Sequence, residues 1–275
     1  MEIISAAILG IIQGLTEFLP VSSSAHLILM PWFFGWEADG LVFDVAVHVG
    51  TAVAVLTFFW ADWIILVREF FAGLIERKPF GNHHRRLAWL LVLGTVPAVI
   101  IGLAFEDVIE EQLRSPLIMV FTLSGLAVLL LFAERTGKQN RTIEKFGWID
   151  SLVIGCSQAV ALIPGVSRSG ITMTTALFRD STRTGAARFS FLLSTPVIVG
   201  AGVLQGWRLF NAVQQPGAAV DVNWSVLGVG AVFAAVTGFL CIQFFLRYLQ
   251  TKSFLPFVIY RFVLAAVVLA YYIQM

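Results

Sequence analysis

The segment TEFLPVSSSAH (residues 16–26) places a carboxylate, three consecutive serines and an imidazole inside an otherwise apolar region. Of the 275 residues in the chain, 58% are hydrophobic and 13% are charged, whereas soluble domains average about a quarter charged residues. The composition therefore indicates an integral membrane protein whose surroundings are the lipid bilayer. A formal net charge of +1 gives no reason to expect a nucleic-acid partner.

Six stretches are long and apolar enough to cross a bilayer, which takes roughly 20 residues. The predicted spans cover residues 42–60, 87–105, 116–133, 188–206, 225–246 and 256–273. Two other apolar regions, 3–34 and 150–178, are interrupted by FLPVSSSAH and LIPGVSRSG respectively. Because proline removes a backbone donor and clashes with the preceding turn, each region is predicted to form two half-length helices in a re-entrant hairpin.

Basic residues are concentrated in alternate connections between these predicted spans. They occupy the connections 61–86, 134–149 and 179–188 and the segment after the fifth span. The other connections are acidic, with Glu37 and Asp39 in one, and Glu106, Asp107, Glu110 and Glu111 against Arg114 in the next. The positive-inside rule therefore predicts a multi-pass inner-membrane protein with cytoplasmic basic connections and both termini outside. The N-terminus lacks the basic start and cleavage site of a signal peptide, so no removable one is expected.

The two halves of the sequence resemble each other. Leu9-Gly10-x-x-Gln13 recurs as Ile154-Gly155-x-x-Gln158, and the two interrupted segments match with a one-residue shift. Each repeat, about 1–135 and about 148–275, contains one hairpin and three spans, and an odd number of spans inverts the second repeat. We therefore predict one domain over 1–275: an all-α polytopic membrane protein with six transmembrane helices and two re-entrant helical hairpins in an inverted-topology repeat. Chance similarity between two apolar, Gly/Ser-rich segments is the alternative.

The first interrupted region carries ionisable groups that need a functional reason. An ionisable side chain inside a bilayer costs about 2.5–3.5 kcal/mol even on lenient insertion scales. Gln13 and Glu17 are spaced i, i+4 and share one face of the first half-helix. Ser22 or Ser23 is expected at the N-cap of the next half-helix, and His26 follows about one turn later.

The second interrupted region supplies a matching helix start. Pro164 and Gly165 break the chain, Ser167 is the expected cap, and Arg168 follows. Two converging helix N-termini offer unpaired N–H groups and positive dipole ends, which bind anions and phosphate above all. Arg168 adds a guanidinium fork suited to phosphate oxygens. The residues predicted to bind phosphate are Ser22, Ser24, Ser167, Ser169, Gly170 and Thr172.

The carboxylate and imidazole suggest catalysis, because a plain anion site does not need a glutamate. Glu17, with Gln13 beside it, could hold Mg²⁺ or Ca²⁺, and such a divalent cation would neutralise charge in phosphoryl transfer. Ser23 is the candidate nucleophile and His26 the candidate base; a water activated by His26 or Glu17 is the alternative. The predicted catalytic residues are therefore Glu17, Ser23, His26 and Arg168.

Structural explanations remain open for each of these residues. The serines could simply cap a helix, His26 could be a packing residue, and Arg168 could be a buried partner of Glu17. Asp44 and His48, spaced i, i+4 near the outer end of the first span, are assigned either a supporting or a purely structural role.

At these residues the chain resembles the undecaprenyl pyrophosphate phosphatase family, also called bacitracin-resistance proteins. That family carries (E/Q)-x-x-x-E followed by F-L-P-V-S-S-x-x-H, and P-G-x-S-R-S-x-x-T, which read here at residues 13–26 and 164–172. The resemblance extends over the full length, including 253–257 and 260–262. Gln13 stands where some members have glutamate, which shifts the expected metal binding toward Glu17.

The resemblance implies removal of the terminal phosphate from a polyprenyl pyrophosphate lipid, with a divalent-cation requirement and an active site at the outer face. This reaction recycles the lipid carrier for peptidoglycan and other cell-wall polymers and gives bacitracin resistance. A second copy of the chain, forming a homodimer, is a further candidate partner. The competing function is a secondary transporter or lipid flippase, because inverted repeats and broken helices suit transport equally well.

Overall fold

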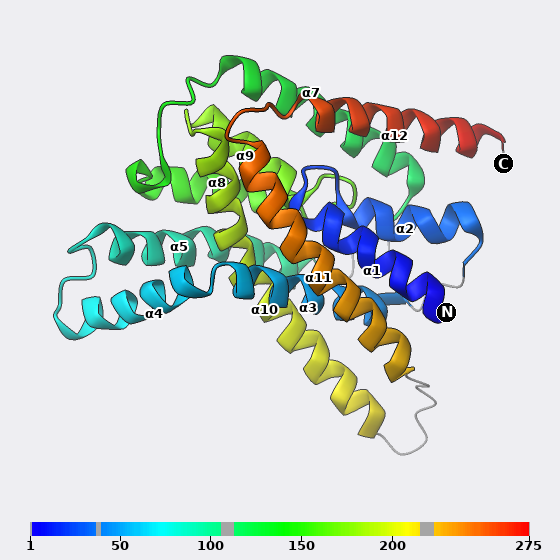
Figure 1. Ribbon diagram of the computed structural model, residues 1–275, viewed down its shortest axis with the longest axis horizontal. Coiled ribbons are helices and arrows are strands. Elements are labelled where there is room, and N and C mark those ends of the chain that lie inside the picture. The colour runs from blue at the N-terminus through cyan, green and yellow to red at the C-terminus, as the bar shows by residue number, and fades with distance from the viewer. Residues whose placement is uncertain (1, 37–39, 106–112, 215–222, 275) are drawn as a thin grey trace.

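The computed structural model describes residues 2–36, 40–105, 113–214 and 223–274, and within these ranges the regular secondary structure is helical apart from one isolated bridge between Arg141 and Ser181. The helices are α1 (Ile3–Phe18), α2 (Ser23–Phe34), α3 (Gly40–Phe58), α4 (Trp60–Ile75), α5 (His83–Ala104), α7 (Pro116–Thr136), α8 (Trp148–Val160), α9 (Arg168–Phe178), α10 (Arg183–Gln214), α11 (Trp224–Tyr248) and α12 (Leu255–Gln274), with a 3-10 turn at Ile143–Lys145 (Figure 1). The predicted all-α class is confirmed.

The predicted membrane orientation depends partly on acidic residues that lie outside the described residues. These are Glu37, Asp39, Glu106, Asp107, Glu110 and Glu111.

The long helices correspond to the predicted spans. Among the described residues, five helices have the length and hydropathy of a membrane span: α5, α7, α10, α11 and α12. The bent pair α3 and α4 provides a sixth when it is counted as one span. The prediction of a polytopic helical membrane protein is therefore confirmed.

One helix replaces part of a predicted connection. The sequence predicts a basic connection from residue 61 onward, but residues Trp60–Ile75 form α4, which is bent by 80° from α3. Two acidic side chains of α4 are paired across to neighbouring helices. Asp62 accepts a hydrogen bond from Arg188 at 2.5 Å, and Glu69 accepts one from Arg85 at 2.9 Å. Asp62 and Glu69, which lie in a segment that the sequence predicts as a connection, are thus on the polar face of an amphipathic helix.

Two pairs of short helices occupy the interrupted regions. α1 has 16 residues and α8 has 13, and a helix needs roughly 20 to cross a bilayer. A non-helical break separates α1 from α2 and another separates α8 from α9. The half-length helices therefore form where proline and serine predict them, while their re-entrant course through the membrane stays a prediction.

Each half of the chain packs its first short helix against the other half. α1 lies along α11, α8 lies along α5, and α7 lies along α12 (Figure 1). Glycines make the closest crossings possible: a Cβ on Gly10 would collide with the backbone of Gly230, and one on Gly155 with the backbone of Gly94. Small residues that let backbones approach are the usual means of helix association in membranes. The breaks are consequently held at fixed positions within the interlocked halves.

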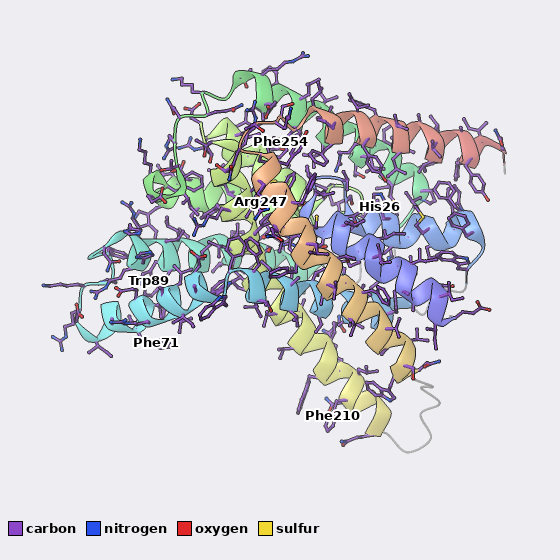
Figure 2. The ribbon with its side chains drawn as sticks, in the orientation of Figure 1. His26, Phe71, Trp89, Phe210, Arg247 and Phe254 are labelled. Atoms are coloured by element: carbon purple, nitrogen blue, oxygen red, sulfur yellow. The ribbon has the colours of Figure 1, made fainter. Side chains whose placement is uncertain are left out.

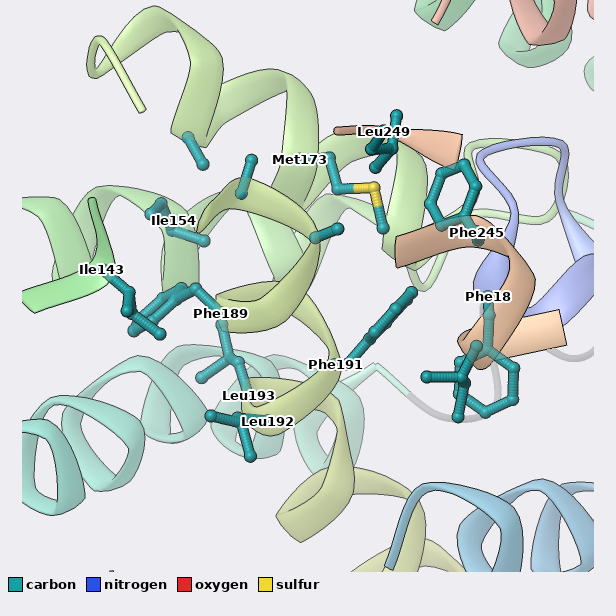
Figure 3. Close-up of a cluster of buried hydrophobic side chains, with 14 of the residues drawn as sticks. Phe18, Ile143, Ile154, Met173, Phe189, Phe191, Leu192, Leu193, Phe245 and Leu249 are labelled. Atoms are coloured by element: carbon teal, nitrogen blue, oxygen red, sulfur yellow. The ribbon is translucent and has the colours of Figure 1, made fainter. Parts of the chain in front are cut away.

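A cluster of aromatic side chains anchors the end of α1. Phe18 packs edge-on against Phe191 of α10, with ring centroids 5.3 Å apart. Phe191 in turn lies 6.2 Å from Phe245 of α11, and Met173 of α9 belongs to the same buried cluster (Figure 3). Because Phe18 directly follows Glu17, this packing fixes the last turn of α1 and with it the position of the carboxylate.

Candidate active site

The first break places a serine in an unusual backbone conformation. α1 ends at Phe18, ahead of Pro20, and Ser22 then adopts φ 76° and ψ 95° as the N-cap of α2. Its hydroxyl accepts a hydrogen bond from Ala25 N at 3.4 Å. A positive φ is uncommon outside glycine and marks strain at functional sites. Ser22, rather than Ser23, is therefore the cap, and Ser23 begins the helix with its hydroxyl free to face elsewhere.

The second break repeats this geometry. Ser167 caps α9 with φ 75° and ψ 113°, and its hydroxyl accepts from Gly170 N at 3.1 Å. The two capping serines are 145 residues apart, as are Gly10 and Gly155. Both breaks thus have the same backbone conformation at equivalent positions, which supports the predicted relationship between the two halves.

The two breaks meet each other directly. Gly165 N donates to Ser24 Oγ at 3.4 Å, and Ser169 Oγ donates to the carbonyl of Leu19 at 3.0 Å. The N-termini of α2 and α9 therefore lie close together, as the sequence predicts. The amide groups and positive dipole ends of the two helix starts favour an anion between them.

Glu17 is the centre of the polar cluster, and its side chain is only 5% exposed. Its Oε2 accepts hydrogen bonds from Gln13 Nε2 at 3.0 Å and from Ser23 Oγ at 2.5 Å. Its Oε1 forms an ion pair with Arg168 of the other half. The structure thus brings together Glu17, Ser23 and Arg168, three of the four predicted catalytic residues.

The fourth predicted catalytic residue, His26, has different partners. Its Nδ1 bonds the carbonyl of Ser22 at 2.7 Å, and its Nε2 bonds the hydroxyl of Tyr260 at 2.6 Å; Figure 2 labels His26 at its place near α2 and α12. Because a carbonyl can only accept, Nδ1 carries a proton, and a neutral ring then accepts at Nε2 from Tyr260. Neither nitrogen bonds Ser23 in this structure, so a base role for His26 stays a prediction.

Asp44 and His48 stand beside Glu17 on α3. His48 Nδ1 donates to the carbonyl of Asp44 at 2.6 Å, which turns Nε2 toward Glu17 Oε2 at 3.6 Å. Asp44 also pairs with Arg114 at 2.7 Å. Sequence reasoning missed Arg114 as a site residue, although a lone arginine in an acidic connection was a usable signal.

The other predicted phosphate-binding residues divide into two groups. Ser24 and Ser167 line the same cavity as Ser23 and Arg168. Ser169 and Thr172 are instead turned into the protein, where Thr172 Oγ1 lies 2.7 Å from Ser190 Oγ. Gly170 allows close packing, because a Cβ there would meet Leu126 at 2.8 Å. These last three residues, like Ser22, do not line the cavity.

The cavity itself is about 360 Å³ in volume and has a polar end and an apolar wall. Glu17, Ser23, Arg168, His48 and Arg114 supply the polar end. Helices α5 and α10, with the segment that follows α8, supply the apolar wall through Ala98, Ala161, Leu162, Val197, Ile198 and Ala201. The arrangement can therefore accept an anionic group joined to a hydrocarbon chain.

Arg261 of α12 ties both breaks together, and it is completely buried. Its guanidinium donates to Pro20 O at 3.3 Å in the first break, and to Gly165 O at 2.9 Å and Val166 O at 3.2 Å in the second. Two more donations, to Leu123 O at 3.0 Å and Thr122 O at 3.1 Å, fix it to α7. Sequence reasoning assigned it no role, although an arginine inside a predicted span was itself a signal.

A helical membrane protein that assembles a glutamate, a serine and an arginine at two facing helix N-termini belongs to the class of membrane-embedded enzymes acting on oxyanions. A profile of the family described as bacitracin resistance protein BacA matches residues 6–267 of the chain. The chain is 49% identical to undecaprenyl-diphosphatase 2 of Stutzerimonas stutzeri (strain A1501) over 272 residues, covering 98% of each protein. It is 48% identical to undecaprenyl-diphosphatase of Desulforudis audaxviator (strain MP104C) over 262 residues, covering 95% of each. The chain therefore belongs to the bacitracin resistance protein family.

We predict that replacing Arg261 with lysine destabilises the fold. A lysine offers a point charge with three donors in place of a rigid fork, so several buried carbonyls lose their partner, at about 1–3 kcal/mol each. Loss of one such partner lowers the midpoint of thermal unfolding in detergent by about 2–12 °C, so the loss of several should lower it by at least that much. Arg247→Lys, at an exposed position on α11, is the matched control and should leave the midpoint unchanged. Equal midpoints for the two variants would contradict the conclusion that Arg261 holds the two breaks together.

Proposed function

We propose that this protein hydrolyses undecaprenyl (polyprenyl) pyrophosphate to the monophosphate and inorganic phosphate. The observation that carries the proposal is the contact of Ser23 and Arg168 with the two oxygens of Glu17, at the polar end of a cavity with an apolar wall. The names of the relatives support the same substrate. The product would be reused as the lipid carrier for peptidoglycan and other cell-wall polymers, which accounts for bacitracin resistance.

The anionic end of the substrate belongs between the two helix N-termini. Arg168 begins α9, directly after the capping Ser167, and it is 15% exposed toward the cavity. Its guanidinium can bind two phosphate oxygens at once, and the amide groups at the helix starts add further donors. The ion pair with Glu17 occupies Arg168 until a phosphate takes its place.

The donor set fits a divalent cation shared with the substrate. Gln13 Oε1 is buried and has no hydrogen-bond partner among the described residues, and Glu17 offers a carboxylate beside it. The described residues contain no group of three His, Cys, Asp or Glu side chains that could hold a metal alone. Mg²⁺ commonly binds through one or two protein oxygens plus phosphate oxygens and water. Bound here, Mg²⁺ or Ca²⁺ would neutralise charge on the pyrophosphate.

Ser23 is the nucleophile that the geometry favours. Its hydroxyl donates to Glu17 Oε2 at 2.5 Å, within the range at which a carboxylate can take a proton. Ser23 Oγ would bond the terminal phosphorus while the bridging P–O bond breaks, releasing the lipid monophosphate. Water then hydrolyses the phosphoserine. The alternative route has Glu17 activate a water directly, with Ser23 only positioning the carboxylate.

Transport is the weaker candidate. Two interlocked halves suit a carrier as well as an enzyme. However, a glutamate repels an anion that only needs to be bound, and the Glu17–Ser23 contact is what a phosphoryl transfer uses. Hydrolysis therefore explains more of the polar cluster than anion transport or lipid flipping does.

We also propose an inverted-topology repeat with both termini outside and the cavity opening to the outer face. The equal spacing of the capping serines, their shared backbone conformation and the paired glycine crossings support the repeat. Arg247 in the last turn of α11 and Lys252 between α11 and α12 support a cytoplasmic location for that connection. The homodimer stays a prediction.

Purified protein in detergent should release phosphate from undecaprenyl pyrophosphate when Mg²⁺ or Ca²⁺ is present. EDTA should abolish the release, and Arg168→Ala should lower kcat by at least about a hundredfold, as losing one positioned oxyanion donor does elsewhere. Arg135→Ala, on the exposed end of α7, is the matched control and should behave as wild type. A folded wild-type protein without phosphate release would refute the proposed function.

The two routes differ in their response to Ser23→Ala. If Ser23 is the covalent nucleophile, kcat should fall by at least about a thousandfold, and phosphoserine should be trapped by rapid quenching of wild type. If Glu17 activates water, the variant should keep most of its activity and no phosphoserine should form. Ser225→Ala, an exposed serine near the start of α11, controls for substitution itself.

The orientation can be tested with cysteines at the two ends of α12, in a chain whose Cys156 and Cys241 are replaced by alanine. Lys252 and Gln274 are both exposed. In intact cells a membrane-impermeant maleimide should label Gln274→Cys from outside and should label Lys252→Cys only after permeabilisation. The reverse pattern would overturn the orientation without affecting the chemistry.

A further inference from the structure

Gln158 of α8 carries a buried side-chain amide that has no hydrogen-bond partner among the described residues. It is 2% exposed, and neither Nε2 nor Oε1 has a hydrogen bond to any residue that the structure describes. A buried polar group left unpaired costs about 1–3 kcal/mol, so native proteins keep few of them. The same side chain forms part of the wall of the cavity that holds Glu17 and Arg168. An unpaired amide at this place needs a reason outside the fold.

Comparison with the other half shows what Gln158 lacks. Gln13 lies 145 residues earlier, at the equivalent position of α1, and donates to Glu17 four residues later at 3.0 Å. The residue four positions after Gln158 is Leu162, which has no polar side-chain atom. The local partner that satisfies the first glutamine is therefore absent for the second. Its partner must come from the cavity.

We propose that Gln158 Nε2 donates a hydrogen bond to a phosphate oxygen of the bound polyprenyl pyrophosphate, which rests on the proposed hydrolysis of that lipid. A pyrophosphate has several oxygens that accept hydrogen bonds, and Arg168 at the start of α9 can satisfy only some of them. A neutral amide adds a donor without adding charge beside the ion pair of Glu17 and Arg168. Gln158 Oε1 then accepts from water in the cavity.

The proposal predicts an unusual combination of effects. Gln158→Met keeps the length of the side chain and removes an amide that no described protein group pairs with, so the thermal midpoint should stay equal or rise. A hydrogen bond to a charged phosphate is lost, so KM should rise at least about tenfold. Because the contact exists in both the ground state and the transition state, kcat should stay within about threefold of wild type.

The experiment measures kcat, KM and the thermal midpoint for wild type, Gln158→Met and Gln158→Leu with undecaprenyl and farnesyl pyrophosphate. A contact to the pyrophosphate should raise KM by the same factor for both chain lengths, whereas a distorted apolar wall should affect the long chain more. Ser157→Ala is the matched control, because its hydroxyl donates to Ile154 O at 2.7 Å within the same helix and does not line the cavity. Gln158→Leu provides a second folded variant if methionine is not tolerated.

The outcomes separate this inference from the function on which it rests. Wild-type protein without activity would refute the proposed hydrolysis. Active wild type with an unchanged KM in the Gln158 variants would overturn the hydrogen bond. A lower thermal midpoint, or a KM effect that depends on chain length, would show that Gln158 supports the fold or the apolar wall, and would also overturn it.

Discussion

The structure depends on satisfying backbone carbonyls at the two breaks, one between α1 and α2 and the other between α8 and α9. A bilayer core offers no water to an unpaired carbonyl, so irregular backbone is tolerated there only when protein groups pair with it. The guanidinium of Arg261 donates to carbonyls of both breaks and of α7. One buried side chain thereby donates hydrogen bonds to the carbonyls of two breaks, which water would do in a soluble protein. Its full burial is reasonable because all three guanidinium nitrogens donate to carbonyl oxygens.

Holding the breaks together also assembles opposite charges from the two halves. Glu17 lies in the last turn of α1 and Arg168 begins α9, and each would be costly in this environment without the other. Capping serines use their hydroxyls on their own helix starts, which leaves Ser23 to contact the carboxylate. The site is therefore organised before any substrate arrives, and such preorganisation is what electrostatic catalysis needs.

Sequence reasoning succeeded where the physics is local. Proline, serine and i, i+4 spacing predicted the two breaks, the caps and the shared face of Gln13 and Glu17. It failed where partners come from distant helices: nothing local shows that Tyr260 meets His26 or that Arg261 reaches both breaks. It also interpreted α4 as a connection, because charges that pair across helices look like loop residues when read along the chain. Long-range partners depend on helix crossings, which in turn depend on small residues such as Gly10 and Gly155.

A pseudo-symmetric frame can produce an asymmetric site when equivalent positions diverge. With a spacing of 145 residues, Ser22 matches Ser167 and both cap a helix. The next positions, Ser23 and Arg168, differ, and Glu17 matches Leu162. The matching pair of caps places two positive helix ends close together, which alone would bind an anion. The divergent positions then give one half the carboxylate and hydroxyl and the other half the arginine, so each half supplies what the other lacks. Hydrolysis requires that difference, whereas binding an anion between two helix starts does not.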